Sequence, residues 1–394
     1  MLLNTILSFA TSVGKIGGTP YKRDKGSLQL YSDQSRLQLL RFITLVEAIW
    51  ILFVYYQCIR FKLEGNIDGF NTLFTFFLGS ILIIIVFLIH NLYHRDFVGL
   101  LNAYFHLMYR LEDIRFNVGI FAENYMPDLD HRTARSMKAL EFLIWYIIIS
   151  MTASGFLMSL MSIVVPSTPI LPTCLIPPDV KFGIILKMIL LPFQMFVPLV
   201  VNGSLSLTMI VIVVYTATVV PFFTNELRIG MGQYKTKNSL RTPKNLMVTF
   251  RSFQLLHQTA MSCFGVFIVP CQTTFSNMIL FSNFMFIRHR AEMQPETNCL
   301  LIGWSTICLL FWMLVLELGG RLHLRGREVL KSWKLHDFGD KSVNRCMSRF
   351  RTSCRPLAIQ FGRTYVIRRL SVLKFIRGLT VGTFRLLLAV DEYY

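Results

Sequence analysis

The sequence predicts an all-α integral membrane protein of seven transmembrane helices, and three observations lead to this fold class. Of the 394 residues, 53% are hydrophobic and only 16% are charged, whereas soluble globular chains carry about 25% charged residues. Apolar windows of about 20 residues, the length that spans a bilayer, recur along the chain. Lysine and arginine gather in alternate connections between these windows. The formal charge of +18 is therefore assigned to a membrane surface, and no nucleic-acid partner is expected.

Six of the apolar windows are clear, and together they set the order of the helices. We expect these spans at about 39–59, 70–92, 139–165, 182–220, 250–287 and 299–318. The fourth window is long enough to tilt, to bend at Pro192 and Pro198, and to project beyond the bilayer. No repeat and no linker divides the chain, so we expect a single domain over 1–394.

The seventh span, at 371–390, is weaker than the others. It is apolar except for Lys374, Arg377 and Arg385. Each cation costs roughly 2.5–3.5 kcal/mol at the centre of a bilayer on insertion scales. We therefore expect this helix to depend on neighbouring helices for its place in the membrane.

The basic residues predict the orientation of the chain. They gather at 15–36, 95–138, 228–251 and, most densely, 321–370. The positive-inside rule then places the N-terminal segment 1–38 and the segment 321–370 in the cytoplasm, and the C-terminus outside. All seven helices obey this one assignment. A G-protein-coupled receptor has the same number of helices but the reverse orientation.

No pattern of residues predicts an enzyme, a cofactor or a metal site. The sequence has no CxxC pair, no glycine-rich phosphate loop and no nucleophile motif. His90 and His94 have the i, i+4 spacing that could serve a metal. Without a third ligand nearby, we interpret them as a hydrogen-bonded pair at the inner end of the second span. A disulfide between Cys174 and Cys299, both in or next to outer segments, stays open.

A charged residue inside a span is by default a functional hypothesis. Glu47 lies about a third of the way into the first span. We expect it either to pair with a basic group on a neighbouring helix or to have no specific role. Glu141, Lys187 and Glu317 lie near span ends, where side chains reach the headgroups.

The chain has seven expected helices, an inside N-terminus, a basic segment at 321–370 before a short last helix, and the C-terminal stretch 378–390. In these features it resembles the insect gustatory and odorant receptor superfamily, and is most like its gustatory receptors. Members close with small residues, a Thr-Tyr pair, an apolar run and Gln-Phe. Here the matching stretch is GLTVGTFRLLLAV at 378–390, with Thr383-Phe384 in place of Thr-Tyr. Residues 355–369 resemble the lead into that helix, and 253–265 resemble the start of the fifth. Val390 and Asp391 depart from the usual Gln and Phe.

This resemblance implies a chemosensory receptor of the plasma membrane that acts as a ligand-gated, non-selective cation channel. It implies four subunits, either identical or combined with a co-receptor, with the last helix lining a central pore. It also implies a pocket for a small organic tastant or odorant in the outer half of each subunit. A G-protein-coupled receptor and a secondary transporter remain alternatives, although we find neither inverted repeats nor paired broken helices.

The last helix has two opposite faces, either of which could line that pore. At 100° per residue, Lys374, Arg377 and Arg385 share one face about 80° wide. The opposite face holds Ile376 and the residues that we expect in the pore, Thr380, Thr383, Leu387 and Asp391. Four copies of leucine form a constriction that gates by dewetting, and a ring of carboxylates at the outer mouth concentrates cations. The other rotation aims the cations inward.

The expected ligand pocket is defined by region more than by residue. Apolar linings with few polar groups suit small organic molecules. The outer halves of the second, third, fourth and sixth spans supply the following aromatic and methionine side chains: Phe74, Phe77, Phe156, Met158, Met161, Phe193, Phe196 and Trp304. Ordinary packing between helices is the alternative explanation for each of them.

Overall fold

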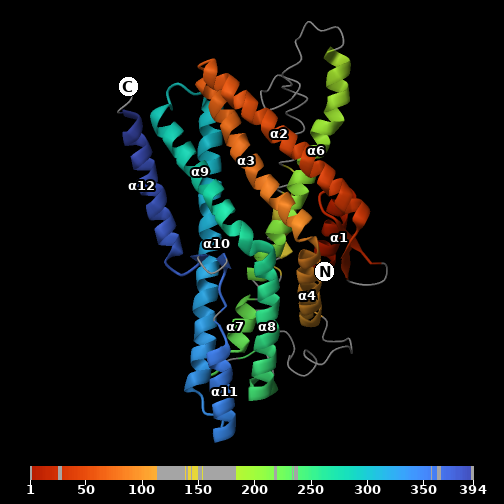
Figure 1. The fold of residues 1–394 in the computed structure, drawn as a ribbon, viewed down its shortest axis with the longest axis vertical. Coiled ribbons are helices and arrows are strands. Elements are labelled where there is room, and N and C mark those ends of the chain that lie inside the picture. Colours follow the sequence, from red (N-terminus) through yellow and green to blue (C-terminus); the bar gives the residue numbers. More distant parts are fainter. Residues whose placement is uncertain are drawn as a thin grey trace.

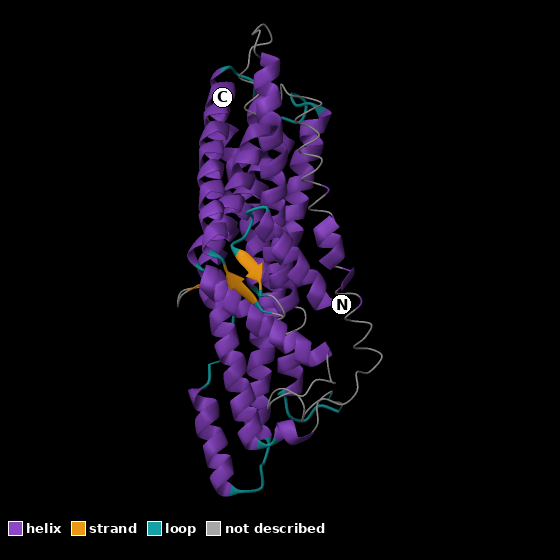
Figure 2. Cartoon of the chain, turned by 90° about the vertical axis from the view of Figure 1, so that its right-hand side faces the viewer, coloured by secondary structure: helices purple, strands orange, loops and turns teal. Residues whose placement is uncertain are grey.

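A computed structural model shows the chain as a long bundle of helices (Figure 1). It describes residues 2–24, 29–112, 138, 141–142, 144–149, 153, 183–216, 220–232, 234, 238–355, 357–361 and 365–391. Short strands form two small antiparallel hairpins near the middle of the bundle, and the other described elements are helices (Figure 2). The predicted all-α class is confirmed.

Six of the seven predicted spans coincide with described helices. These are α2 (Gln34–Leu63), α3 (Ile67–Leu92), α6 (Gly183–Val214), α8 (Pro243–Phe264) with α9 (Ile268–Arg288), α10 (Pro295–Leu335) and α12 (Ser371–Asp391). Of the third predicted span, 139–165, the structure describes residues 141–142, 144–149 and 153, all of them helical. All but α12 contain a segment long and apolar enough to cross a membrane.

Several shorter elements lie outside the predicted spans. The additional helices are α1 (Leu2–Lys15), α4 (His94–Glu112), α7 (Val220–Glu226), α11 (Lys341–Ser353) and the 3-10 turns η3 (Asn238–Arg241) and η4 (Gly265–Phe267). Strand β1 (Tyr21–Arg23) pairs with β2 (Leu30–Ser32), and β3 (Gln360–Phe361) pairs with β4 (Tyr365–Val366). All are too short or too polar to register as a bilayer span.

Two spans differ from the prediction in a way that bears on function. The fifth is not one helix, because η4 separates α8 from α9 just before Pro270, a residue that cannot continue the helical hydrogen-bond ladder. The sixth, α10, has 41 residues and continues to Leu335, well past the apolar window that ends at residue 318. Its second half is basic and amphipathic, so hydropathy alone underestimates its length.

The turns sort to the two ends of the bundle. The α2–α3 turn, the α9–α10 turn and the C-terminal end of α12 lie at one end in Figure 1. Helix α11, the start of α8 and the basic half of α10 lie at the other end. The described basic segments after residue 228 therefore share one end of the molecule, as the alternation of charge predicts.

The N-terminal segment is part of the core. Ile6, Leu7 and Ala10 of α1 are fully or almost fully buried. The side chain of Asn102 in α4 bonds both the N–H and the carbonyl of Leu30, each at 2.8 Å. These two hydrogen bonds give the N–H and the carbonyl of Leu30 the partners that a third strand of this two-stranded hairpin would otherwise provide.

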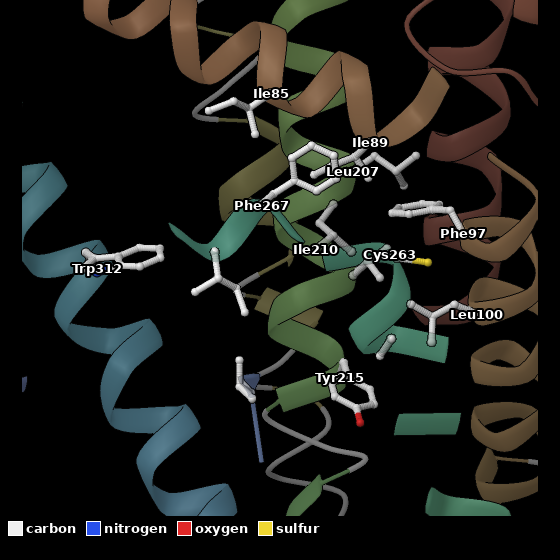
Figure 3. Packing of buried hydrophobic residues seen from close by; sticks show 14 of the residues in the cluster. Ile85, Ile89, Phe97, Leu100, Leu207, Ile210, Tyr215, Cys263, Phe267 and Trp312 are labelled. Atoms are coloured by element: carbon white, nitrogen blue, oxygen red, sulfur yellow. The ribbon is translucent and has the colours of Figure 1, made fainter. Parts of the chain in front are cut away.

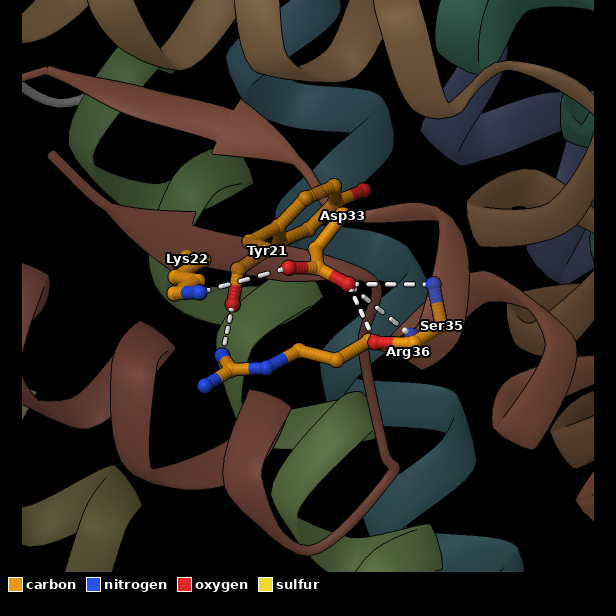
Figure 4. Close-up of polar contacts among 5 residues, drawn as sticks. All are labelled: Tyr21, Lys22, Asp33, Ser35 and Arg36. Carbon is orange, nitrogen blue, oxygen red and sulfur yellow. Dashed lines mark hydrogen bonds and ion pairs between the residues drawn. The ribbon is translucent and has the colours of Figure 1, made fainter.

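The hairpin of β1 and β2 is tied to the start of α2 (Figure 4). Asp33 caps α2 by accepting hydrogen bonds from the backbone N–H of Ser35 at 3.0 Å and of Arg36 at 3.3 Å. Hydrogen bonds from the Ser35 hydroxyl and from the Arg36 amide lower the pKa of Asp33 to about 2. The Arg36 guanidinium donates to the carbonyl of Tyr21, which links helix and hairpin.

A buried chain of hydrogen bonds joins this hairpin to α3 and α6. The Tyr21 hydroxyl lies 2.8 Å from Nδ1 of His90, and Nε2 of His90 lies 3.0 Å from Oγ1 of Thr208. The Thr208 hydroxyl donates its one proton to the Ser204 carbonyl at 3.0 Å, so its oxygen accepts from Nε2 of His90, which carries the ring proton. In the neutral ring Nδ1 is then the acceptor, and the Tyr21 hydroxyl donates to it.

The main hydrophobic core lies where α3, α4, α6, α8 and α10 meet (Figure 3). Each helix contributes buried apolar side chains: Ile85, Ile89, Phe97, Leu100, Leu207, Ile210, Cys263 and Trp312. The same core extends to residues just before α12 and to α12 itself, through Ile367 and Leu379. Helix α12 is therefore anchored to the core that the other helices share.

We expect Tyr21→Phe to destabilise the fold. The substitution leaves Nδ1 of His90 buried without its hydrogen-bond donor, which costs about 1–3 kcal/mol. The thermal unfolding midpoint of the purified protein should fall accordingly. Tyr56→Phe is the matched control, because Tyr56 is 59% exposed on α2, and it should keep the midpoint. Equal midpoints for the two variants would contradict this role of Tyr21.

Candidate functional site

Helix α12, which holds the residues expected in the pore, stands at the edge of the bundle beside α9 and α10 (Figure 1). Phe375 and Leu379, each 7% exposed, form its packed face. Gly382 continues this face, since a Cβ there would lie 2.9 Å from Leu280 of α9. The rest of the helix surface has no cover within the described part of the chain, where Leu373, Phe384 and Leu388 are 62–68% exposed.

The packed face lies between the two faces that the sequence distinguishes. Taking 100° per residue with Lys374 at zero, Phe375, Leu379 and Gly382 fall at about 80–140°. The three cations lie on one flank of this stripe, and the predicted pore residues lie on the other. Lys374, Arg377, Arg385 and Thr380 are exposed, and Thr383 and Leu387 are partly exposed. Both flanks are therefore free to meet a pore, a lipid or a second subunit.

Thr380 and Asp391 are two of the four predicted pore residues. The Thr380 hydroxyl donates to the carbonyl of Ile376 at 3.0 Å, so it is satisfied within the helix. Asp391 is the last residue of α12, and its side chain lies outside the described residues. The backbone of α12 therefore carries all four predicted pore residues in one row.

The segment that enters α12, which we name the strap (357–369), threads between α8 and α10. Leu357, Ala358, Ile359 and Ile367 are at most 9% exposed. The N–H of Ile367 donates to the carbonyl of Ile359 at 2.9 Å, next to the β3–β4 pair. An irregular backbone buried in this way must find hydrogen-bond partners in its surroundings.

Polar side chains of α8 and α9 bind the strap and Arg355 just before it, and His257 supplies a partner for the strap backbone itself. The Gln254 amide donates to the Arg355 carbonyl, just before the strap, at 3.2 Å, and Nε2 of His257 lies 2.9 Å from the carbonyl of Ala358. The Tyr365 hydroxyl donates to Oε1 of Gln272 at 2.8 Å. The strap is thus attached to α8 and α9 by polar contacts.

On its other side the strap lies directly on the backbone of α10. A Cβ at Gly320 would lie 2.9 Å from Cα of Arg369, and one at Gly326 would lie 3.0 Å from the backbone nitrogen of Leu357. Neither backbone atom can yield as the end of a flexible side chain can. Glycine at these two positions therefore sets how closely strap and helix approach.

The structure brings two of the predicted ligand residues together. Phe74 and Phe77 of α3 join an aromatic cluster with Tyr55 of α2 and Phe281 of α9. Ring centroids are 4.5 Å apart for Phe74 and Phe281, and 5.4 Å apart for Tyr55 and Phe77. This cluster links three helices, and its ring pairs are tilted, with 36° between the planes of Tyr55 and Phe77 and 57° between those of Phe74 and Phe281.

The other predicted ligand residues do not join this cluster among the described contacts. Trp304 of α10 is partly buried against the main core, and Phe196 of α6 is 40% exposed. Phe193 lies in α6 with its side chain outside the described residues, and Phe156, Met158 and Met161 lie outside them entirely. The full lining of the predicted pocket stays a prediction.

His90 and His94 make separate hydrogen bonds. His90 is buried between Tyr21 and Thr208, whereas Nδ1 of His94 lies 3.1 Å from the carbonyl of Asn91. A helix break at Tyr93 separates the two residues, so the i, i+4 spacing does not place them on one face. Across the described residues, no three His, Cys, Asp or Glu side chains are grouped to hold a metal. The interpretation of both as hydrogen-bonded histidines is confirmed.

Glu47 is buried in α2, at 3% exposure. In the part of the chain that the structure describes, no lysine or arginine lies within ion-pair distance of its carboxylate. The predicted pairing with a basic group is therefore not found there. Cys299 is a free, exposed thiol of α10, and its possible partner Cys174 lies outside the described residues.

Sequence reasoning missed one polar contact at the heart of the bundle. The Tyr215 hydroxyl at the end of α6 lies 2.6 Å from Nδ1 of His257 in α8. Both residues are 5% exposed. The sequence signal that could have indicated this contact is that both side chains are polar and lie inside apolar windows, where polar side chains rarely occur without a partner.

The fold has known counterparts. No known protein family and no curated protein matches the sequence. Among solved structures, the insect olfactory receptor OR5 from Machilis hrabei in complex with eugenol is similar, with a TM-score of 0.65, 12% identity, and 98% of each chain covered. A second structure of the same receptor is similar over 100% of both chains, with a TM-score of 0.61 and 12% identity. The predicted seven-helix membrane fold is confirmed.

We expect Gly320→Ala to weaken the seat of the strap. The new methyl group would meet the backbone of Arg369 at 2.9 Å, so strap or helix must shift, and the thermal unfolding midpoint should fall. Gly303→Ala is the matched control in the same helix, because a Cβ there meets nothing within 4 Å. Alanine favours a helix over glycine by about 1 kcal/mol, so this control should keep or raise the midpoint. A Gly320→Ala protein as stable as the control would show that the strap is not closely seated.

Proposed function

We propose that this multi-pass membrane protein is a chemosensory receptor subunit that acts as a ligand-gated, non-selective cation channel of the plasma membrane. The main observation in support of this proposal is the full-length similarity in fold to an insect olfactory receptor. The C-terminal resemblance to gustatory and odorant receptors supports the same conclusion independently. Neither comparison suggests an enzyme.

The arrangement of the turns supports an orientation with the N-terminus inside and the C-terminus outside. Basic α11 and the basic half of α10 share one end of the bundle, and the C-terminal end of α12 reaches the other (Figure 1). The positive-inside rule favours the cytoplasm for the basic end. This orientation argues against a G-protein-coupled receptor, and the lack of inverted repeats in the sequence argues against a secondary transporter.

The pore in this proposal is built from four copies of α12. Its position at the edge of the bundle leaves the row of Thr380, Thr383 and Leu387 free to face a central axis. Four Leu387 side chains would form an apolar constriction that excludes water when closed. Four Asp391 carboxylates at the outer mouth would attract cations, while the basic flank turns towards neighbouring helices or headgroups.

The ligand in this proposal is a small organic tastant or odorant. The similar receptor from Machilis hrabei was solved with eugenol, a small organic molecule. In this chain the cluster of Phe74, Phe77 and Phe281 supplies the aromatic surface that such ligands need. We propose that the remaining predicted residues of 156–196, with Trp304, complete the lining.

Epitope tags at the two termini test the orientation. In intact cells an antibody should reach the C-terminal tag, and it should reach the N-terminal tag only after permeabilisation. The reason is that the lysine- and arginine-rich connections between the spans fit the positive-inside rule in this one orientation. An N-terminal tag reached in intact cells would favour a G-protein-coupled receptor instead. Two internal tags would mean that α12 does not span.

Leu387→Ser tests the pore row. Serine wets an apolar constriction, so the current in the absence of ligand should rise several-fold when the variant is recorded with Na⁺ as the main external cation. Leu388→Ser is the matched control, because Leu388 is 68% exposed on the outward side of α12. The control should leave this current unchanged. A rise in Leu388→Ser alone would assign the pore to another face.

A further inference from the structure

Tyr215 and His257 form a hydrogen-bonded joint between three elements of the bundle. Tyr215 and Thr216 form a π-helical turn directly after α6, a local widening that is frequent at functional sites. The Tyr215 hydroxyl lies 2.6 Å from Nδ1 of His257 in α8. Nε2 of His257 lies 2.9 Å from the carbonyl of Ala358 in the strap.

The direction of each hydrogen bond follows from the last acceptor. A carbonyl can only accept, so Nε2 of His257 carries a proton and donates to Ala358. In the neutral ring Nδ1 is then an acceptor, and the Tyr215 hydroxyl donates to it. Tyr215 donates, His257 accepts at Nδ1 and donates at Nε2, and Ala358 accepts. Both hydrogen bonds form only while the end of α6, α8 and the strap keep their relative positions.

The contact continues from the strap to α12. Ala358 directly precedes Ile359, whose carbonyl accepts the N–H of Ile367 at 2.9 Å. Four residues after Ile367, α12 begins at Ser371. Two hydrogen bonds therefore separate His257 from the strand that enters α12, with no flexible side chain between them.

Helix α6 reaches from this joint to the outer half of the bundle. Phe196, one of the predicted ligand residues, precedes Tyr215 by 19 positions on the same helical segment, which is roughly 28 Å at the rise of an α-helix. A tilt or rotation of α6 would move the Tyr215 hydroxyl relative to His257. Hydrogen bonds weaken steeply with distance and angle, so the joint would respond to small movements.

We propose that Tyr215 and His257 couple the movement of α6 to the strap and thus to α12. This inference rests on the proposed function for the statement that α12 lines a pore, but its structural part does not. Both are positioning residues, which act on the pore helix through the carbonyl of Ala358. The Tyr21–His90 pair repeats the same chemistry at a place that does not contact the strap, and so provides an internal control.

Hydrogen exchange tests the structural part on the full-length protein in lipid nanodiscs. Tyr215→Phe removes only the hydroxyl, and deuterium uptake in peptides covering 357–361 and 365–367 should become about tenfold faster, the scale of one lost buried hydrogen bond. Tyr21→Phe, the identical change in the other pair, should leave these peptides unchanged. Unchanged uptake in Tyr215→Phe, or equal acceleration in both variants, would overturn the joint.

Two substitutions of His257 test the coupling. The amide of His257→Gln can accept from Tyr215 and donate to Ala358, whereas His257→Leu can do neither. Na⁺ current with and without eugenol as the probe should therefore be retained in Gln but changed several-fold in Leu, at matched surface expression. Equal currents in the Leu and Gln variants would overturn the coupling.

The two proposals fail in different ways. A wild-type protein that carries no current under any condition would contradict the channel proposal, and the exchange experiment would then decide on the joint alone. Normal channel currents combined with unchanged exchange in Tyr215→Phe would reject the joint while the channel proposal stands.

Discussion

The architecture depends on one constraint, which is that the buried irregular backbone of the strap must satisfy its hydrogen bonds inside a bundle of helices. A buried carbonyl or N–H without a partner is costly. His257 binds the carbonyl of Ala358, and the N–H of Ile367 binds the carbonyl of Ile359, while Gln254 binds the Arg355 carbonyl just before the strap. The glycines of α10 allow the backbone of the strap to lie against the helix, and α8 and α9 separate at Gly265, where the carbonyl of Gln360 would meet a Cβ at 2.9 Å. The position of α12 follows from these contacts.

The same solution appears twice, with different consequences. Tyr21 and His90 bind the N-terminal hairpin to α3 and α6, and Tyr215 and His257 bind the end of α6 to α8 and the strap. In each pair one tautomer of histidine satisfies every group. Thr208 and Tyr215 lie seven positions apart on one helical segment. Helix α6 therefore lies between the two Tyr–His pairs, and through them it links the buried N-terminal hairpin to the strap that enters α12.

The transmembrane spans could be predicted from the sequence because hydropathy reports them directly. The packing of the helices against one another could not be predicted in this way. The windows at 39–59 and 70–92 lie within α2 and α3. The window of α10 ended at residue 318 because the helix continues as a basic, amphipathic segment to Leu335. The wheel of α12 predicted a basic flank and a row of expected pore residues, but it did not identify the face of Phe375 and Leu379, which packs on α9 and α10. Long-range contacts such as His257 with Ala358, 101 positions apart, leave no local pattern in one sequence.

Helix α12 is a poor solitary span, and this weakness explains why its surroundings are so constrained. Three cations, at roughly 2.5–3.5 kcal/mol each near the bilayer centre, offset much of what its apolar residues contribute. Among the described residues, only a narrow stripe of the helix packs against its neighbours, and both flanks are partly or fully exposed. A helix in this condition depends on the strap at its N-terminal end and on whatever covers the open flanks. Movement of the strap would therefore act on a helix that the described part of the bundle holds by one face.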